Sequence, residues 1–182
     1  MASVTWTKIA RRTRVPLGFA FAAVYLWLAR PTVMSMMIGS VLIVPGLTIR
    51  ALASGHVQKN EQLTTSGPYA YTRNPLYLGS LILAVGFAVS ARNWWIGAGL
   101  ILFFLAIYLP VIRGEEAFLG EHFPEFAEYA RQVPRLIPRL SSLGGGGGTF
   151  SWDLYCKHRE YNATLGSMAV MAALGARLLW MR

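Results

Sequence analysis

The chain has 182 residues, of which 54% are hydrophobic and only 14% are charged. An average soluble domain carries roughly a quarter charged residues, so this composition excludes an ordinary cytosolic enzyme and a disordered chain. The net charge is +9, but apolar blocks separate the basic residues and keep them from gathering on one polar face. This pattern is typical of the flanks of membrane helices, and it predicts contact with membrane lipids and no nucleic-acid partner.

Five uncharged runs are candidate membrane-spanning helices, and together they predict an all-α, polytopic membrane bundle. The runs cover residues 15–29, 31–49, 74–91, 93–112 and 161–176. A bilayer core of about 30 Å needs about 20 apolar residues, so the three middle runs are long enough with little help from their flanks. The last run reaches that length only by passing Arg177, whose long side chain can extend to the interface. The short connection between the third and fourth runs predicts a tight antiparallel hairpin.

The distribution of basic residues orients the helices. Four Lys and Arg residues lie between positions 8 and 14, ahead of the first run, whereas the loop after that run carries only Arg30. By the positive-inside rule, the N-terminus and the two long polar loops face the cytoplasm, and so does a site built from those loops. A cleaved signal peptide is the competing interpretation of the first run, because Ala20-Phe21-Ala22 resembles a cleavage site. It would leave a hydrophobic region of only about five residues, which is short for a signal peptide.

Five consecutive glycines at 144–148 interrupt the polar region before the last apolar run. We interpret residues 141–150 as a flexible linker between a membrane core at 1–140 and a C-terminal segment at 151–182 that contains the fifth helix. A glycine-rich nucleotide-binding loop would need a strand before it and a helix after it, and the sequence predicts neither.

The first motif spans residues 65–79 and leads into the third apolar run. Gly67-Pro68 favours a turn, and Pro75 suits the first turn of a helix, where its missing N–H leaves no bond unmade. Arg73 and Asn74 then lie at the cytoplasmic N-terminus of a membrane helix, whose free N–H groups attract an anion such as a carboxylate. The alternative is that Arg73 only anchors the helix and that the neighbouring tyrosines form an aromatic belt.

The second motif, Arg113-Gly114-Glu115-Glu116, directly follows the fourth run. Adjacent carboxylates at a membrane boundary are costly unless they are paired or solvated, and the hairpin brings them to the same side as Arg73. They indicate a site for a cationic ligand, with a solvated helix end as the alternative. Aromatic and leucine residues then recur at near-helical spacing and predict an interfacial helix able to cover a cavity. These residues are Phe118, Leu119, Phe123, Phe126 and Tyr129.

Together the two motifs offer an anion site, a cation site and aromatic surfaces at one end of a helical bundle. S-adenosylmethionine needs all three, because it carries a carboxylate, a cationic ammonium and sulfonium, and an adenine ring. The chemical fit alone does not identify the ligand. The chain's three histidines lack ligand-like spacing, so no metal site is predicted.

The motifs follow one another in a specific order over about residues 55–140. The order is Ser66-Gly67-Pro68-Tyr69, Tyr71-Thr72-Arg73-Asn74-Pro75-Leu76-Tyr77-Leu78-Gly79, Arg113-x-Glu115-Glu116-x-x-Leu119 and Val133-Pro134-Arg135. It resembles the isoprenylcysteine carboxyl methyltransferase family of membrane proteins, to which phospholipid N-methyltransferases are related. The resemblance implies a pocket for S-adenosylmethionine at the cytoplasmic face, closed by the segment after the hairpin. It also implies a lipophilic acceptor that enters from the bilayer.

The resemblance further implies roles for individual residues. The residues expected against the cofactor are Tyr69, Asn74, Pro75, Leu76, Tyr77 and Glu115. Arg113 is expected to face the carboxylate of the acceptor, Arg73 to support either partner, and Glu116 to act as the base if the acceptor is an amine. The family most often has His where this chain has Asn74, and an Asn side chain takes no proton near neutral pH. A carboxylate acceptor needs no base, because it attacks the methyl carbon already deprotonated.

These observations lead to three candidate functions. The leading one is methyl transfer from S-adenosylmethionine to a lipophilic carboxylate of the isoprenylcysteine kind by an integral membrane enzyme. The second is N-methylation of a phospholipid or a small amine. The third is a non-catalytic membrane binding module with the same fold, which Asn74 slightly favours and the intact second motif argues against.

Overall fold

A computed structural model describes residues 16, 18, 20–58, 61–143 and 148–181 of the chain. Within these residues the structure consists of helices and loops without a strand, which confirms the all-α prediction. Residues 20–28 are helical. The later elements are α2 (Val33–Ser54), η1 (Gly67–Ala70), α3 (Pro75–Ala91), α4 (Trp94–Phe103), η2 (Phe104–Tyr108), α5 (Leu109–His122), α6 (Phe126–Gln132), α7 (Trp152–Lys157) and α8 (Tyr161–Trp180).

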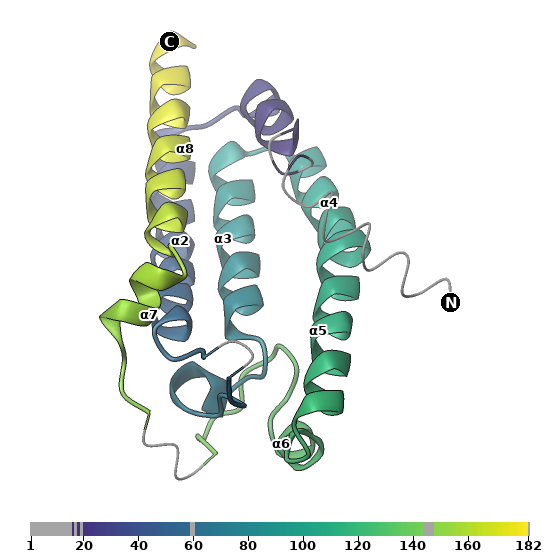
Figure 1. Cartoon of the computed structure of the whole chain (residues 1–182). Helices are drawn as coiled ribbons and strands as arrows, with labels where there is room; N and C mark the ends of the chain where they lie inside the picture. The colour runs from purple at the N-terminus through teal and green to yellow at the C-terminus, as the bar shows by residue number, and fades with distance from the viewer. Residues whose placement is uncertain (1–15, 17, 19, 59–60, 144–147, 182) are drawn as a thin grey trace.

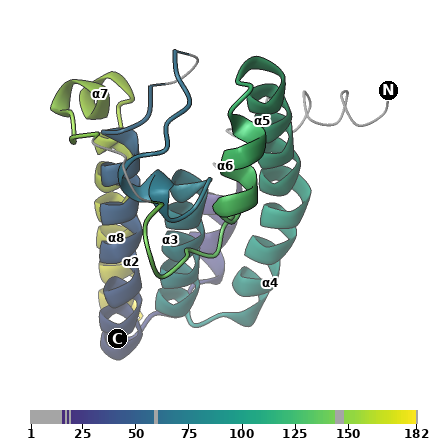
Figure 2. The same ribbon diagram turned by 90° about the horizontal axis from the view of Figure 1, so that it is seen from below.

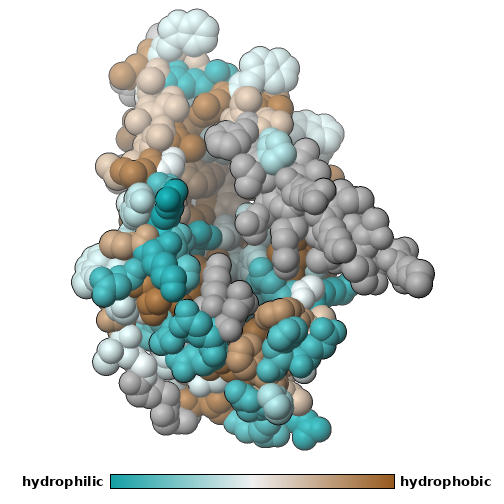
Figure 3. Space-filling model, in the orientation of Figure 1, coloured by the Kyte–Doolittle hydropathy of each residue, from teal (hydrophilic) through white to brown (hydrophobic). Residues whose placement is uncertain are grey.

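The long helices lie beside one another, and the short polar elements gather at one end of the bundle. α2, α3 and α8 run side by side, whereas the continuous helix formed by α4, η2 and α5 leans away from α3 (Figure 1). α6 and α7 lie at the same end, on either side of the loops that precede α3 (Figure 2). Hydrophilic side chains concentrate toward that end on the face shown in Figure 3. The polar end is therefore where a site between the membrane and water can form.

Three helical stretches of the described chain are long and apolar enough to cross a membrane. They are α2 with 22 residues, the continuous helix Trp94–His122 with 29 residues, and α8 with 20 residues. α3 is apolar as well, but its 17 residues fall just short of that length. The predicted first span lies partly outside the described residues. Three of the five predicted spans are thus confirmed as candidate membrane helices, and the other two stay predictions.

α2 and α3 touch closely because both carry glycines at seven-residue spacing. A Cβ at Gly86 would lie 2.9 Å from the carbonyl oxygen of Gly39, and one at Gly79 would lie 2.8 Å from that of Gly46. Neither distance leaves room for a side chain, so the two backbones are in contact at both levels. This contact fixes the N-terminal end of α3, where the first motif lies, against the C-terminal half of α2.

The opposite end of the bundle is closed by side chains that bind backbone carbonyls. Arg92 ends α3 in the left-handed conformation with φ 51°, and Asn93 then caps α4, which confirms the tight hairpin. The Asn93 amide donates to the carbonyl of Leu28 at 3.0 Å, and the Arg177 guanidinium donates to that of Ala29 at 2.6 Å. Arg177 therefore satisfies carbonyls at the end of the first helix and ties α8 to it.

The helix of the fourth span continues well beyond the apolar run. The run ends at Ile112 as predicted, but α5 continues to His122, so the second motif lies on the helix and not after it. The π-helical turn η2 lies within this helix just before Pro110, whose missing N–H disturbs the regular bonding pattern. The helical repeat of about 100° per residue therefore sets the direction in which each side chain of the second motif points.

The predicted interfacial helix is divided in two. Phe118 and Leu119 belong to α5, the chain breaks helical geometry at Phe123, and the separate helix α6 contains only residues 126–132. Pro124 explains the break, because a proline disfavours helical geometry in the residue before it. The buried faces of Phe126 and Tyr129 then pack together against the loop that leads to α3.

We predict that Gly86→Val separates α2 from α3 and destabilises the protein. The added side chain meets the backbone of α2, and overpacking of this kind typically costs about 1–3 kcal/mol. The measurement is the thermal-unfolding midpoint of the purified protein in detergent. Gly166→Val on α8 is the matched control, because nothing lies within 4 Å of a Cβ at Gly166. Equal midpoints for the two variants would contradict the close contact.

Candidate functional site

A cavity of about 820 Å³ lies at the polar end of the bundle. α2, α3, α5 and the start of α8 contribute its walls, together with η1 and α6. The predicted site residues that line it are Tyr69, Arg73, Asn74, Leu76, Tyr77, Glu115 and Glu116. The two motifs, which lie about forty residues apart in the chain, therefore meet at one cavity.

Two predicted site residues do not line this cavity. Pro75 is buried at the first position of α3, where it starts the helix. Arg113 is exposed on α5, roughly 160° around the helix from Glu115 at 100° per residue. Glu116 lies only about 60° from Arg113 around the same helix, but the Glu116 side chain is buried in the cavity wall whereas Arg113 is exposed. The structure thus does not bring Arg113 to the cavity that the other site residues line, and its role toward the acceptor stays a prediction.

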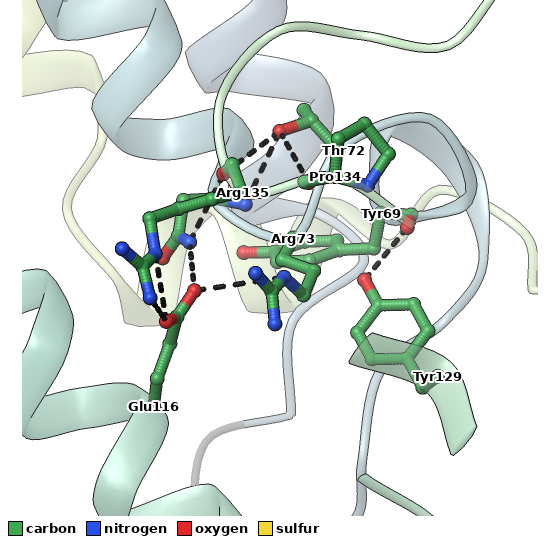
Figure 4. Close-up of polar contacts among 8 residues, drawn as sticks. Tyr69, Thr72, Arg73, Glu116, Tyr129, Pro134 and Arg135 are labelled. Carbon is green, nitrogen blue, oxygen red and sulfur yellow. Dashed lines mark hydrogen bonds and ion pairs between the residues drawn. The ribbon is translucent and has the colours of Figure 1, made fainter. Parts of the chain in front are cut away.

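Glu116 is the centre of the polar contacts in the cavity wall. It is 8% exposed, and its Oε2 accepts a hydrogen bond from Arg135 Nε at 2.8 Å and lies 2.7 Å from Arg135 Nη2 (Figure 4). Its Oε1 accepts from the Asn74 amide at 3.0 Å and lies 3.6 Å from Arg73 Nε. Both Arg135 nitrogens converge on this one oxygen, so a charge-assisted hydrogen bond is reinforced by a close ion pair.

The same cluster holds the segment after α6 against the start of α3. The Asn74 amide donates a second hydrogen bond to the carbonyl of Arg135 at 3.1 Å, and the Thr72 hydroxyl donates to that carbonyl at 3.1 Å. The backbone N–H of Arg73 donates to the carbonyl of Pro134 at 2.9 Å. Asn74 uses both hydrogens of its amide, whereas a neutral imidazole has a single N–H. Asparagine therefore suits this position as a structural bridge.

Two charged groups at the cavity lack a complete set of partners. Arg73 Nε is buried and has no hydrogen-bond partner, because Glu116 Oε1 is too far away at 3.6 Å. The Glu115 carboxylate lines the cavity, and no described residue forms an ion pair or hydrogen bond with it. A buried N–H without an acceptor is unfavourable in the absence of a ligand. The cavity therefore offers one donor and one carboxylate to a molecule that carries both charges.

Tyrosine rings form a neutral part of the wall. Burial raises the pKa of Tyr69 far above its ordinary value, and the nearby Tyr129 and Glu115 raise it further. Burial also raises the pKa of Tyr129, although the Arg73 guanidinium opposes that shift. The Tyr129 hydroxyl donates to the carbonyl of Tyr69 at 2.7 Å. Both phenols stay protonated at neutral pH and present uncharged aromatic faces, which suit a cation or a flat ring.

Comparison with known proteins shows the family. A model of the phospholipid methyltransferase family matches residues 17–125. The chain belongs to this family. It is thus an integral membrane protein of a methyltransferase family, and the match contains both motifs that meet at the cavity.

The relatives of this phospholipid methyltransferase family member carry varied names. The chain is 46% identical over 88 residues to the cobalt-zinc-cadmium resistance protein CzcN of Cupriavidus metallidurans, which is 48% of this chain and 41% of the relative. It is 40% identical over 84 residues to the nickel-cobalt-cadmium resistance protein NccN of Alcaligenes xylosoxydans, covering 46% and 39%. It is 30% identical over 105 residues to the protein-S-isoprenylcysteine O-methyltransferase of Schizosaccharomyces pombe, covering 56% and 43%. The aligned regions span less than half of each relative, and no solved structure matches the chain.

Some residues of the cavity wall were not predicted. They are Arg50 of α2, Ser80 of α3, and His158 and Glu160 near the start of α8. The sequence does hold a signal for one pair, because Arg50 directly follows the second apolar run and Glu160 directly precedes the fifth. Opposite charges at the ends of two membrane helices are candidates for an ion pair when the helices are neighbours. The described residues contain no group of three or more His, Cys, Asp or Glu that could hold a metal ion.

We predict that Glu116→Gln destabilises the protein. The variant keeps the shape of the side chain but leaves Arg73 and Arg135 without their counter-charge, which should lower the free energy of unfolding by about 1–3 kcal/mol. The measurement is thermal unfolding in detergent.

Glu128→Gln is the matched control for that variant. The Glu128 side chain is 63% exposed and interacts with Arg131 and Gln132 of its own helix, so its loss should cost less than about 0.5 kcal/mol. A Glu116→Gln protein as stable as Glu128→Gln would show that the cluster does not hold the cavity wall.

Proposed function

We propose that the protein is a methyltransferase that uses S-adenosylmethionine and acts on a lipophilic carboxylate in the membrane. Family membership supports methyl transfer, and the name of the Schizosaccharomyces pombe relative supports a carboxyl acceptor. The observation that carries the proposal is the pair of incompletely partnered groups at the cavity, the Arg73 Nε donor and the Glu115 carboxylate. They match the carboxylate and the cationic groups of the cofactor.

The residues of the cavity fit this cofactor. Arg73 and the N-terminus of α3 would bind its carboxylate, Glu115 its ammonium or sulfonium, and Tyr69 or Tyr129 its adenine ring. When bound, S-adenosylmethionine supplies an electrophilic methyl group on a sulfonium. The volume of about 820 Å³ lies in the usual range of pockets for cofactors, roughly 300–1,000 Å³.

The remaining work of the protein is to position the acceptor and to exclude water. The Glu116 cluster holds residues 134–135 over the start of α3, and Tyr129 ties α6 to η1. These contacts close the cavity on the side of the polar loops. In a dry and rigid site, in-line alignment of a carboxylate with the methyl carbon accounts for most of the catalysis.

N-methylation of a phospholipid or an amine is the second candidate, and the description of the matching family favours it. An ammonium acceptor must lose a proton, and Glu116 is the predicted base. Both oxygens of Glu116 accept hydrogen bonds from Arg135 and Asn74, so it is engaged as a structural anchor. This engagement favours an acceptor that needs no base. A non-catalytic module is the third candidate, and it would bind no S-adenosylmethionine.

We predict that Glu115→Gln weakens binding of S-adenosylmethionine by about 1–3 kcal/mol, the usual value of a hydrogen bond to a charged group. Calorimetry on the purified protein, with the cofactor and with its demethylated product, provides the measurement. A loss limited to S-adenosylmethionine assigns Glu115 to the sulfonium, and an equal loss for both ligands assigns it to the ammonium. Glu121→Gln, at an exposed position of the same helix, is the control. Unchanged affinity in Glu115→Gln would remove Glu115 from the site.

We further propose that the cavity faces the cytoplasm. Cys156, the single cysteine, is exposed on α7 at the polar end. We predict that a membrane-impermeant maleimide labels Cys156 only after the cells are permeabilised, with Cys156→Ser as the blank. Labelling of intact cells would place the cavity on the external side.

A further inference from the structure

A second polar cluster in the cavity wall joins three helices. Arg50 Nε donates to Glu160 Oε1 at 2.5 Å, and Arg50 Nη1 donates to the Ser80 hydroxyl and, at 3.4 Å, to the carbonyl of Leu76. Arg50 belongs to α2, Ser80 to α3, and Glu160 directly precedes α8. Glu160 lies beyond the residues 17–125 that the family model matches, so a residue outside the matched region completes this wall.

The cluster presents a fixed cation to the cavity. The side chains of Arg50 and Glu160 are 22% and 10% exposed, and Arg50 and Arg73 are the two described arginines that line the cavity. Arg50 Nη2 has no hydrogen-bond partner among the described residues, since the hydrogen bonds of this guanidinium use only Nε and Nη1. Desolvation of such a pair offsets much of its attraction, so the pair adds little stability by itself. It does hold a guanidinium with a free donor in one orientation.

The Arg50 cluster lies deeper in the bundle than the Glu116 cluster. Asn74 directly precedes α3, whereas Ser80 lies six residues further along it, a rise of roughly 9 Å along the helix. The polar loops cover the Asn74 end of the cavity. A lipid-like molecule that enters from the bilayer therefore reaches Arg50 before it reaches Asn74.

An apolar groove of about 450 Å³ lies between α3 and α4. On α3, Tyr77 and Ser80 line the cavity, and Leu81 and Ala84 line the groove along the same stripe. On the facing helix, Tyr108 lines the cavity and Phe104, one turn earlier, lines the groove. An apolar chain in this groove would end beside the second polar cluster.

We propose that Arg50 binds the anionic head group of the methyl acceptor, a carboxylate or a phosphate on a single apolar chain that lies in the groove. Glu160 and Ser80 are positioning residues that fix the guanidinium. The proposal rests on the proposed function, and it assigns to Arg50 the contact that the family resemblance implied for Arg113. This assignment explains why charged groups lie at two ends of the cavity, because one end would bind the cofactor and the other would bind the methyl acceptor.

Binding of three probes to the purified full chain in detergent tests the head-group contact. The probes are an N-acetylated farnesylcysteine, its neutral methyl ester, and a single-chain lysophosphatidate. We expect Arg50→Gln to weaken binding of the farnesylated acid about tenfold or more, as for the loss of a charged hydrogen bond, and to leave the ester within about threefold. Arg50→Lys should recover part of the loss. Tighter wild-type binding of the lysophosphatidate than of the acid would assign the head group to a phosphate.

Controls separate this effect from a change in the fold. Arg131→Gln, at a side chain that is 80% exposed on α6, should bind all probes as the wild type does. If Arg113→Gln loses the acid and Arg50→Gln keeps it, the head group belongs to Arg113 and the proposal is wrong. The proposal is also wrong if the wild type does not distinguish the acid from the ester.

A second variant tests the groove. No described atom lies within 4 Å of a Cβ at Gly97 on the groove wall, so Gly97→Leu should fill the groove without displacing its neighbours. We expect it to weaken binding of the acid and of the ester equally, whereas Gly166→Leu on α8 should change neither.

Binding of S-adenosylhomocysteine to the same samples keeps the two proposals apart. If it binds while Arg50→Gln keeps full affinity for the acid, only the head-group proposal fails; if the wild type does not bind it, the proposed function fails.

Discussion

The buried carboxylate of Glu116 is the interaction on which the geometry of the site depends. It joins α5 to the start of α3 through Asn74 and to the segment after α6 through Arg135. The Asn74 amide and the Thr72 hydroxyl reinforce this connection, since both donate to the carbonyl of Arg135. A buried charge is costly unless it is paired, so the Glu116 carboxylate needs partners from other parts of the chain. Its contacts with those partners bring the two motifs together and close the polar end of the cavity.

The packing of the helices explains why a cavity remains beneath this closure. Glycines let α2 and α3 approach until their backbones touch, whereas the helix of α4, η2 and α5 leans away from α3 (Figure 1). The uneven spacing leaves space on one side of α3 and none on the other. Charged groups from α2, from α5 and from the residues just before α3 and α8 then line a single space, with Glu116 near the loops and Arg50 further into the bundle. Such an arrangement suits a polar cofactor and a lipophilic acceptor that approach from opposite sides.

Much of this fold could be predicted from the sequence, because long apolar runs and a short Arg92-Asn93 turn are local signals. Local turn chemistry also placed Arg73 and Asn74 correctly at the start of a helix. The direction of Arg113 could not be predicted in the same way. It depends on whether the helix ends with the apolar run at Ile112, and the helix continues through the motif, where the buried carboxylate of Glu116 is paired with the distant Arg135. The pairing of Arg50 with Glu160 was missed for a related reason, since 110 residues and a glycine-rich segment separate the two.

The central claim is that the cavity between the two motifs binds S-adenosylmethionine. Ultraviolet crosslinking of the cofactor, labelled with tritium in its methyl group, tests this most directly when the labelled peptides are then identified by mass spectrometry. The account predicts label in the peptides that contain Tyr69 to Tyr77 or Glu115 to Leu119, and loss of that label when excess S-adenosylhomocysteine competes. Label confined to peptides outside the cavity, or label that S-adenosylhomocysteine does not displace, would contradict it.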